Sequence, residues 1–437
     1  MYYKNDSFKV KRYKNIISKK MNLLCDNKSL VNGMLFSMFS FINKGFIFLL
    51  LLILANYINP KEYGYLSLFV TVLMVISYII ALSTEGYLSV SYFKDKREGT
   101  RQTFTDIMLI AITILTLLII VLFLGGTKIS QLLQLPLDIL YIAVGICFFT
   151  LIFNLYIDYA RLQDRVKFYG IMSCSNALLN FVLSILMVKT LLFGWQGRVY
   201  AQFICFIVYG SFGLYFFTSK NFWVKPNFKS LKRLIIWGLP VIPHLAANFI
   251  RQGCDRYIIS YSHSITDVGL FSFALNIANI VIMIGIGFNQ SNSVDIYKIL
   301  GDTDSTPNEK RQKLVRQRIL IQRVFFLLTL IVMICGYLIF PIILPKYAGA
   351  MNYFLILAIW GFFQCLYFLY TNYLFYYNKT KQIMYVTFGT SLVHLGLSLI
   401  FTKYSLYYTC LIYVLIQFLI FILIRRIAVK TVELNNI

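Results

Sequence analysis

The stretch WGLPVIPHLAANFIRQGCDRYIISY, residues 237–261, decides how the rest of the chain is interpreted. It is long and apolar enough to cross a membrane, yet it carries two prolines, a histidine, two arginines and an aspartate. Its polar residues recur every three or four positions and so share one helix face: His244, Asn248, Arg251 with Gln252, and Asp255 with Arg256. A charge at the bilayer centre costs roughly 2.5 to 3.5 kcal/mol, so this face must be turned toward protein or water.

The composition places the whole chain in a membrane. Of its 437 residues, 59% are hydrophobic and only 13% are charged, and the mean hydropathy is +0.71. Apolar runs of about 20 residues, the length that crosses ~30 Å of hydrocarbon, occur twelve times. We therefore predict an all-α integral membrane protein with twelve spans: 30–57, 65–93, 104–126, 137–158, 168–191, 199–218, 235–260, 269–290, 319–340, 351–373, 383–401 and 407–424.

The distribution of basic residues orients these spans. If the connecting segments alternate between two sides, most of the 41 Lys and Arg fall on one side, which is typical of cytoplasmic loops. The opposite loops hold six: Lys61, Lys128, Lys189, Arg198, Lys346 and Lys403. We expect both termini in the cytoplasm, with residues 1–29 forming a basic arm rather than a cleaved signal peptide. The net charge of +24 is then a topology signal and requires no nucleic-acid partner.

The cysteines do not indicate metal or disulfide chemistry. There are eight, none in a CxxC spacing, and seven lie within predicted spans. We expect small buried residues, no metal site and no cofactor other than a coupling cation, Na⁺ or H⁺, if transport is driven by one.

Two pairs of segments indicate an internal repeat. EYGYLSLF at 62–69 is similar to DVGLFSFA at 267–274, which aligns Gly64 with Gly269 and Ser67 with Ser272. A second pair, 161–184 and 375–398, aligns Asn180 with His394. Both pairs relate spans 1–6 to spans 7–12. With six spans per repeat, the two halves run parallel and are related by an axis along the membrane normal.

This repeat predicts two pseudo-symmetric six-helix bundles, at 30–218 and 235–424, with a cytoplasmic linker at 219–234 and a cytoplasmic tail at 425–437. Two such bundles suggest a transporter that binds its substrate between them and works by alternating access. Pro240 and Pro243 are the prolines that fall inside predicted spans, and each removes a backbone donor. We expect the seventh span to be bent or partly unwound there and to act as a hinge.

Charges near the middle of the spans predict the polar site. Lys44 lies in the first span, Glu85 in the second, and Arg251, Asp255 and Arg256 in the seventh, which leaves a small positive excess. The simplest interpretation is a hydrated cavity that receives an anionic solute, with Asn276 and Asn279 of the eighth span available for hydroxyl groups. Structural alternatives remain open. Arg251 and Asp255, at i and i+4, could neutralise each other, Glu85 could pair with Lys44, and the asparagines could only join helices.

The chain resembles the Wzx-type polysaccharide flippases of the multidrug/oligosaccharidyl-lipid/polysaccharide (MOP, MATE-like) exporter superfamily. The resemblance rests on residues 237–261 followed by DVGLFSFALNIANIV, on PKEYGYLSLF after the first span, and on the basic turn RLQDRVKFYGI after the fourth. Phe271 departs from the family, in which tyrosine is common at this position. Twelve spans also fit this family better than the lipid II flippases, which have fourteen.

The resemblance implies an undecaprenyl-diphosphate-linked oligosaccharide as substrate, flipped across a bacterial cytoplasmic (inner) membrane for O-antigen (lipopolysaccharide) or capsule assembly. It implies substrate contacts at Lys44, Arg251 and Arg256, to which the polar face of the seventh span adds Asn248 and the eighth span adds Asn276 as candidate contacts. Asp255 would orient the arginines or take part in ion coupling, and Glu85 would be a second place for a coupling cation. Polymerase and chain-length proteins of the same pathway are implied partners.

Two other functions remain open. A drug or cation antiporter of the MATE branch shares the fold but tends to need more buried acids than Glu85 and Asp255. A glycan polymerase, ligase or glycosyltransferase usually carries catalytic residues on a substantial external loop, and the external loops here are short. The longest loop after residue 29, 291–318, falls on the cytoplasmic side and reads as a flexible linker without a metal or nucleophile constellation. We therefore do not expect an enzyme.

Overall fold

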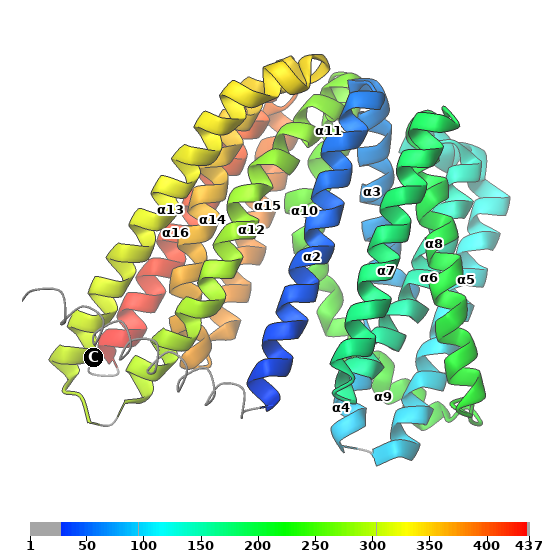
Figure 1. The fold of residues 1–437 in the computed structure, drawn as a ribbon, viewed down its shortest axis with the longest axis horizontal. Coiled ribbons are helices and arrows are strands. Elements are labelled where there is room, and N and C mark those ends of the chain that lie inside the picture. The colour runs from blue at the N-terminus through cyan, green and yellow to red at the C-terminus, as the bar shows by residue number, and fades with distance from the viewer. Residues whose placement is uncertain (1–27, 95, 303, 435–437) are drawn as a thin grey trace, which may run out of the picture.

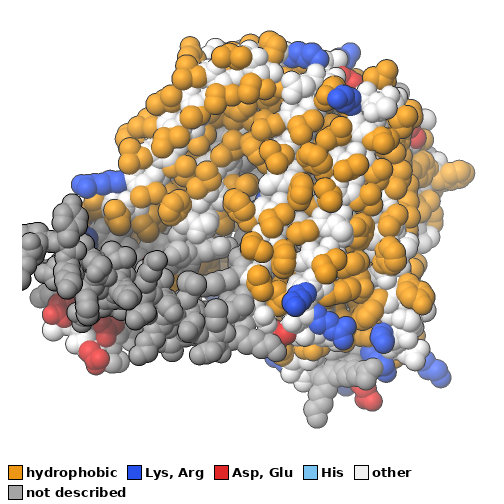
Figure 2. Space-filling view, in the orientation of Figure 1, with side chains coloured by type: hydrophobic (Ala, Val, Ile, Leu, Met, Phe, Trp, Pro, Cys, Tyr) orange, Lys and Arg blue, Asp and Glu red, His pale blue; other side chains and the backbone are white. Residues whose placement is uncertain are grey.

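The computed structural model describes residues 28–94, 96–302 and 304–434, so most of the predicted basic arm lies outside the described residues. Twelve helical segments of this part are long and apolar enough to cross a membrane. The predicted all-helical fold with twelve spans is confirmed. Figure 2 shows one face of the molecule, on which hydrophobic side chains cover the helices.

The first half of the chain forms an N-terminal bundle (Figure 1). Within it, α6 packs against α3, α5 and α8, while α2 packs against α7. Its elements are α2 (Lys28–Tyr57), α3 (Pro60–Ile80), α4 (Tyr87–Lys94), α5 (Lys96–Leu133), α6 (Leu137–Leu162), α7 (Val166–Ile185), η1 (Leu186–Thr190) and α8 (Gly194–Ser219).

The second half forms the C-terminal bundle, in which α14 packs against α12, α13 and α16, and α15 packs against α10 and α16. Its elements are α9 (Phe228–Gly238), η2 (Leu239–Val241), α10 (Ile242–Gln252), α11 (Cys254–Ser262), α12 (Ile265–Gly301), α13 (Pro307–Ile343), η3 (Pro345–Ala350), α14 (Met351–Tyr376), α15 (Thr380–Phe401) and α16 (Leu406–Leu434). We call the end where α12 turns into α13 the basic end, and the end where α2 turns into α3 the opposite end; they are at the bottom and top of Figure 1.

The bundles meet mainly where α3 packs against α12. Gly64 and Gly269 make this contact close: a Cβ on Gly64 would lie 2.0 Å from the carbonyl oxygen of Ile265, and a Cβ on Gly269 would lie 1.8 Å from that of Pro60. Pro60 and Ile265 occupy equivalent positions in the repeat, so the contact is reciprocal, as across a twofold axis. The residues that revealed the repeat in the sequence therefore lie against each other.

The seventh span is broken, as its prolines indicated. A short 3-10 turn at Leu239–Val241 contains Pro240, and Pro243 lies in the first turn of α10. A second break falls between α10 and α11 at Gly253. The helix also begins earlier than predicted, because α9 occupies part of the segment assigned to a linker and packs against α4 and α5. This span therefore starts against the N-terminal bundle and ends in the C-terminal one.

The second span is also broken, which the sequence did not indicate. The predicted helix 65–93 is interrupted after Ile80, where Leu82 and Ser83 have positive φ of 48° and 56°. The Thr84 hydroxyl donates to the Ala81 carbonyl at 2.6 Å, one of the local bonds that compete with a helix. Gly238 packs here, since a Cβ on it would lie 2.4 Å from the Leu82 carbonyl oxygen. The breaks of the second and seventh spans thus lie against each other.

Two further expectations are corrected at the basic and opposite ends. Residues 291–318 are not a flexible loop, since α12 and α13 are helical throughout most of them. A capping box, in which Thr306 and Glu309 each bond the other's backbone N–H, starts α13 with Pro307 in its first turn. Pro341, expected in a loop, lies inside the last turn of α13.

Candidate functional site

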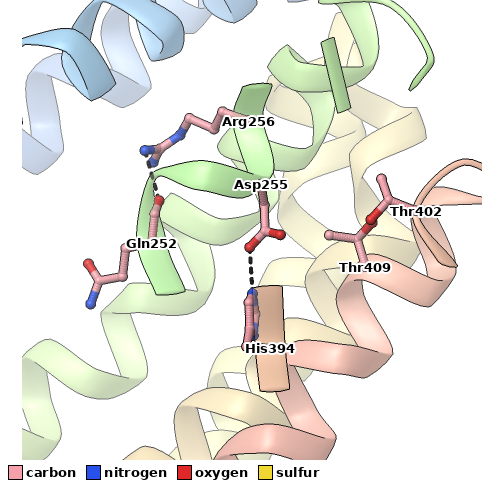
Figure 3. A network of polar contacts seen from close by, with 6 residues as sticks. All are labelled: Gln252, Asp255, Arg256, His394, Thr402 and Thr409. Atoms are coloured by element: carbon pink, nitrogen blue, oxygen red, sulfur yellow. Dashed lines mark hydrogen bonds and ion pairs between the residues drawn. The ribbon is translucent and has the colours of Figure 1, made fainter. Parts of the chain in front are cut away.

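The aspartate of the seventh span is paired with a residue the sequence reasoning had not selected. Asp255 Oδ2 lies 2.7 Å from His394 Nε2 of α15, and the two residues are only 1% and 2% exposed. Figure 3 shows the carboxylate pointing at the imidazole. The suggested neutralisation of Asp255 by Arg251 is therefore wrong, because the carboxylate is directed into the C-terminal bundle rather than along its own helix. Among the described residues Asp255 forms no ion pair with Arg251 or Arg256.

Arg251 lies beside this pair in the interior of the C-terminal bundle. It lines a cavity of about 20 Å³, room for roughly one water molecule, together with Gln252, Trp360, Gln364, His394, Tyr413, Ile416 and Gln417. Three buried polar atoms of the lining residues have no hydrogen-bond partner among the described residues: Arg251 Nε, the Tyr413 hydroxyl and Gln417 Nε2. Buried polar atoms are normally satisfied, so this cavity is a site where a small polar species can bind.

Arg256 points away from the Asp255–His394 pair, toward the Gln252 carbonyl in Figure 3. Its Nε donates to the Ser272 hydroxyl of α12 and its Nη1 to the Thr71 hydroxyl of α3, each at 3.2 Å. This guanidinium therefore joins three helices across the boundary between the bundles. In this conformation it is bonded to protein rather than open to a ligand.

Asn276 belongs to the same boundary. Its amide donates to the Tyr63 hydroxyl of α3 at 2.8 Å, which is the helix-joining role left open for it. Two more bonds close the opposite end, from Lys346 Nζ to the Asn56 carbonyl at 3.0 Å and from the Tyr347 hydroxyl to the Ile58 carbonyl at 3.1 Å. We call the set Thr71, Arg256 and Ser272, with Tyr63 and Asn276, the inter-bundle latch.

The other predicted residues lie apart from these two groups. Asn248 Nδ2 donates to the Tyr78 hydroxyl of α3 at 3.4 Å. Lys44 is exposed on α2, and Glu85 lies in the break of the second span with Oε2 buried and unpartnered among the described residues. The ion pairs of the described residues do not include Lys44 with Glu85, so the suggested pairing does not form. The side chains of Pro243 and His244 lie outside the described part of the structure.

The repeat would have pointed to His394. Its counterpart in the N-terminal bundle, Asn180 of α7, accepts a hydrogen bond from Arg198 Nη1, which also lies 3.0 Å from the Ser184 hydroxyl. Ser184 aligns with Ser398, whose hydroxyl has no partner among the described residues. The two aligned positions therefore have different partners. In the N-terminal bundle Asn180 is bonded to the Arg198 guanidinium, and in the C-terminal bundle His394 is bonded to the Asp255 carboxylate.

Solved structures with this arrangement are membrane transporters. An inward-facing MATE multidrug transporter of the MOP superfamily matches 88% of this chain and 94% of its own, with 15% identity and a TM-score of 0.69. An outward-facing MATE multidrug transporter matches with 14% identity over 92% of this chain and 95% of its own, and a TM-score of 0.62. The twelve spans and the two bundles define an integral membrane protein with the MATE-like transporter fold.

The chain belongs to the polysaccharide biosynthesis protein family, which matches residues 29–291. The "Lsg locus putative protein 1" of Haemophilus influenzae is 25% identical over 379 residues, covering 82% of this chain and 87% of the relative. A second Haemophilus influenzae protein, described as an uncharacterized membrane protein, is 23% identical over 367 residues, covering 81% and 86%.

Proposed function

We propose that this chain is a lipid-linked oligosaccharide flippase. It moves undecaprenyl-diphosphate-linked repeat units from the cytoplasmic to the periplasmic leaflet of a bacterial cytoplasmic membrane, for O-antigen or capsular polysaccharide assembly. The observation that carries the proposal is the pair of half-buried arginines of the seventh span, Arg251 and Arg256. Family membership supports the pathway, and the fold supports transport.

The charge balance of the seventh span favours an anionic substrate. Asp255 is the acidic residue next to the two arginines, and His394 holds it. Neither Arg251 nor Arg256 takes part in an ion pair with a described residue. Two cations without an ion-pair partner at membrane depth are costly, and an anionic substrate would compensate them. A diphosphate supplies that charge and matches the geometry of guanidinium groups.

Alternating access follows from where the bundles are joined. The inter-bundle latch and the Gly64–Gly269 contact hold them together near the opposite end, in keeping with the higher similarity to the inward-facing transporter. When that end opens, Arg256 loses Thr71, and Asn276 loses Tyr63. The guanidinium and the amide then become free for the diphosphate and sugar hydroxyls. Before that end opens, the substrate contacts Arg251, Lys44 and Asn248. The breaks at Pro240 and Pro243 provide the hinge.

A coupling cation, H⁺ or Na⁺, has its best place at the Asp255–His394 pair. The Asp255 carboxylate lies 2.7 Å from the His394 imidazole, its Oδ1 is buried without a hydrogen-bond partner among the described residues, and His394 lines a cavity of about 20 Å³. Glu85 is the second place, because its Oε2 is buried without a partner among the described residues. The basic arm and loops would then meet the cytoplasmic enzymes and the polymerase of the pathway.

The test is a mass-spectrometric count of polyprenyl-diphosphate-linked oligosaccharides in cells depleted of this protein. An impermeant periplasmic probe reads which leaflet they occupy. The flippase predicts complete repeat units that accumulate facing the cytoplasm. Complete units that reach the periplasmic face without being polymerised would instead support a glycan polymerase or glycosyltransferase. An unchanged pool would favour a MATE-type drug or cation antiporter, which the fold also supports.

A further inference from the structure

A second polar cavity lies at the basic end of the C-terminal bundle, away from the boundary between the bundles. It has a volume of about 240 Å³ and lies between α13, α14 and α16. In Figure 1 α13 lies at the far edge of this bundle, on the side away from the N-terminal bundle. The cavity is lined by Arg311, Leu314, Val315, Arg318, Tyr370, Tyr373, Arg425, Ala428, Val429, Val432 and Glu433.

Three guanidiniums converge on this cavity from two helices. Arg311 and Arg318 come from α13, and Arg425 comes from α16. The Arg318 guanidinium lies over the Tyr370 ring, 5.9 Å from its centroid, and this cation–π contact positions the guanidinium at the cavity. None of the three is in an ion pair with a described residue, although Glu433 also lines the cavity. The positive-inside rule requires only that arginines lie on the cytoplasmic side, and it does not explain why three of them line one cavity.

On the outer face of α13, the basic residues of this cavity are followed by exposed apolar residues. A neighbouring hollow of about 610 Å³ shares Arg311 and Val315 with the cavity and adds Arg316, Arg323, Gln312, Ile319 and Leu320. Beyond it, α13 exposes a run of large apolar side chains toward the opposite end: Phe326, Leu327, Leu330, Ile331 and Ile334. A cluster of guanidiniums at the foot of an exposed apolar helix face matches a lipid with an anionic head and acyl chains.

The repeat places a similar cavity in the N-terminal bundle. It has a volume of about 590 Å³, and its lining includes Tyr159, Arg165 and Lys220. The alignment of 161–184 with 375–398, continued two residues back, relates Tyr159 to Tyr373. Its basic lining differs, because Arg165 and Lys220 are its basic residues and three arginines do not meet there. The three-arginine arrangement is specific to the C-terminal bundle.

We propose that the cavity between α13, α14 and α16 binds the phosphate headgroup of an anionic glycerophospholipid of the cytoplasmic leaflet. Arg311, Arg318 and Arg425 hold the phosphate, and the acyl chains lie along the exposed face of α13. Guanidinium groups bind phosphate oxygens in pairs, which favours this headgroup over a neutral one. The site lies outside the path between the bundles, so the assignment does not depend on the transported substrate.

The test uses the full-length protein purified in detergent and native mass spectrometry to count bound phosphatidylglycerol and phosphatidylcholine. We expect preferential binding of phosphatidylglycerol, weakened about 100-fold in an R311Q/R318Q/R425Q variant, at roughly fivefold for each cation near the membrane surface. The matched control is K225Q/K229Q/K232Q, which removes three exposed cations from the same end without touching the cavity. Equal losses in both variants, or undiminished binding in the first, would overturn the proposal.

Two further measurements keep the result decisive. E433Q removes the carboxylate from the cavity without removing an arginine, and it should tighten phosphatidylglycerol binding about fivefold even if the triple variant folds poorly. Unchanged or weaker binding in E433Q counts against the site. Titration with undecaprenyl phosphate distinguishes the source of the phosphate. Displacement of one phosphatidylglycerol per protein would assign the cavity to the substrate lipid and overturn the phospholipid assignment, whereas independent binding supports it.

Discussion

Gly64 of α3 and Gly269 of α12 meet across the boundary between the two bundles, where a Cβ on Gly269 would lie 3.0 Å from the Gly64 backbone nitrogen. Each glycine contacts the first residue of the other's helix, so the twofold relation of the repeat maps the contact onto itself. A flippase that alternates between two faces must separate and re-form this contact in each cycle.

Gly269→Ala should therefore hold the opposite end apart. The added Cβ would lie 1.8 Å from the Pro60 carbonyl oxygen, and overpacking of this kind costs about 1 to 3 kcal/mol. We expect the closed fraction to fall about 5- to 150-fold and glycan export to fall with it. Spin labels at Lys61 and Thr266, both exposed and equivalent in the repeat, report the separation. Gly287→Ala and Gly389→Ala, which meet nothing within 4 Å, should leave the distance unchanged.

Thr71→Val should weaken the inter-bundle latch without removing a charge. Arg256 Nη1 then loses its bond to α3, and a hydrogen bond to a charged group contributes about 1.5 to 3 kcal/mol. We expect the opposite end to open more often, seen as faster modification by an impermeant reagent of a cysteine introduced at Ser67, which is buried on α3 between Gly64 and Thr71. Thr113→Val, which loses only a bond to the carbonyl of Leu109 within its own helix, is the control. Equal modification rates in both variants would exclude a latch at Thr71.

His394→Ala should destabilise the protein more than its size suggests. It leaves the Asp255 carboxylate buried without its partner, and breaking a buried ion pair by removing one member costs about 3 to 5 kcal/mol. The pair Asp255→Asn with His394→Asn should recover most of that loss, since two amides can bond each other without a charge. Thermal unfolding of Asp255→Asn, His394→Asn, the double variant and the parent in detergent gives the coupling energy. Additive losses would show that the two side chains do not act as a pair.

Arg251 should be required for export but not for folding. Arg251→Gln removes the cation at the cavity beside His394, and we expect export to fall at least tenfold while the protein remains in the membrane. Arg251→Lys should retain part of the activity, because it keeps the charge but loses the planar fork that binds phosphate oxygens. Glycan export in a deletion strain, normalised to membrane abundance, is the measurement. Full export with Arg251→Glu would remove this residue from the substrate path.

We expect Lys346 to lie on the periplasmic side of the membrane. A reporter that is active only in the periplasm should therefore be active when it is fused after this residue. Lys346 lies in η3, at the opposite end, where basic residues are sparse. Alkaline phosphatase and green fluorescent protein fusions at this position give opposite readouts on the two sides. A fusion in 302–306, at the turn between α12 and α13, should give the reverse result. Cytoplasmic activity after Lys346 would contradict the predicted orientation.

The architecture was accessible from the sequence because it depends on short-range properties. The length of each apolar run decides whether it crosses the membrane, and all twelve spans are recovered. The break in the seventh span follows from Pro240, whose missing N–H acts locally. The break in the second span was missed because it contains no proline, and Gly86 within it was not taken as a helix end. It depends on hydroxyl bonds at Ser83 and Thr84 and on Gly238, which packs there from another helix.

The partners of the polar residues were decided by the tertiary structure alone. Spacing placed Asp255 and Arg256 on the seventh span, but adjacent residues on a helix point in different directions. One side chain meets His394, 139 positions later, and the other meets Thr71, 185 positions earlier. A sequence pattern specifies the face on which a charge lies, whereas the fold brings a particular group within hydrogen-bond distance of it. Because a buried charge depends on that group for its stability, its role follows from the packing of the bundles.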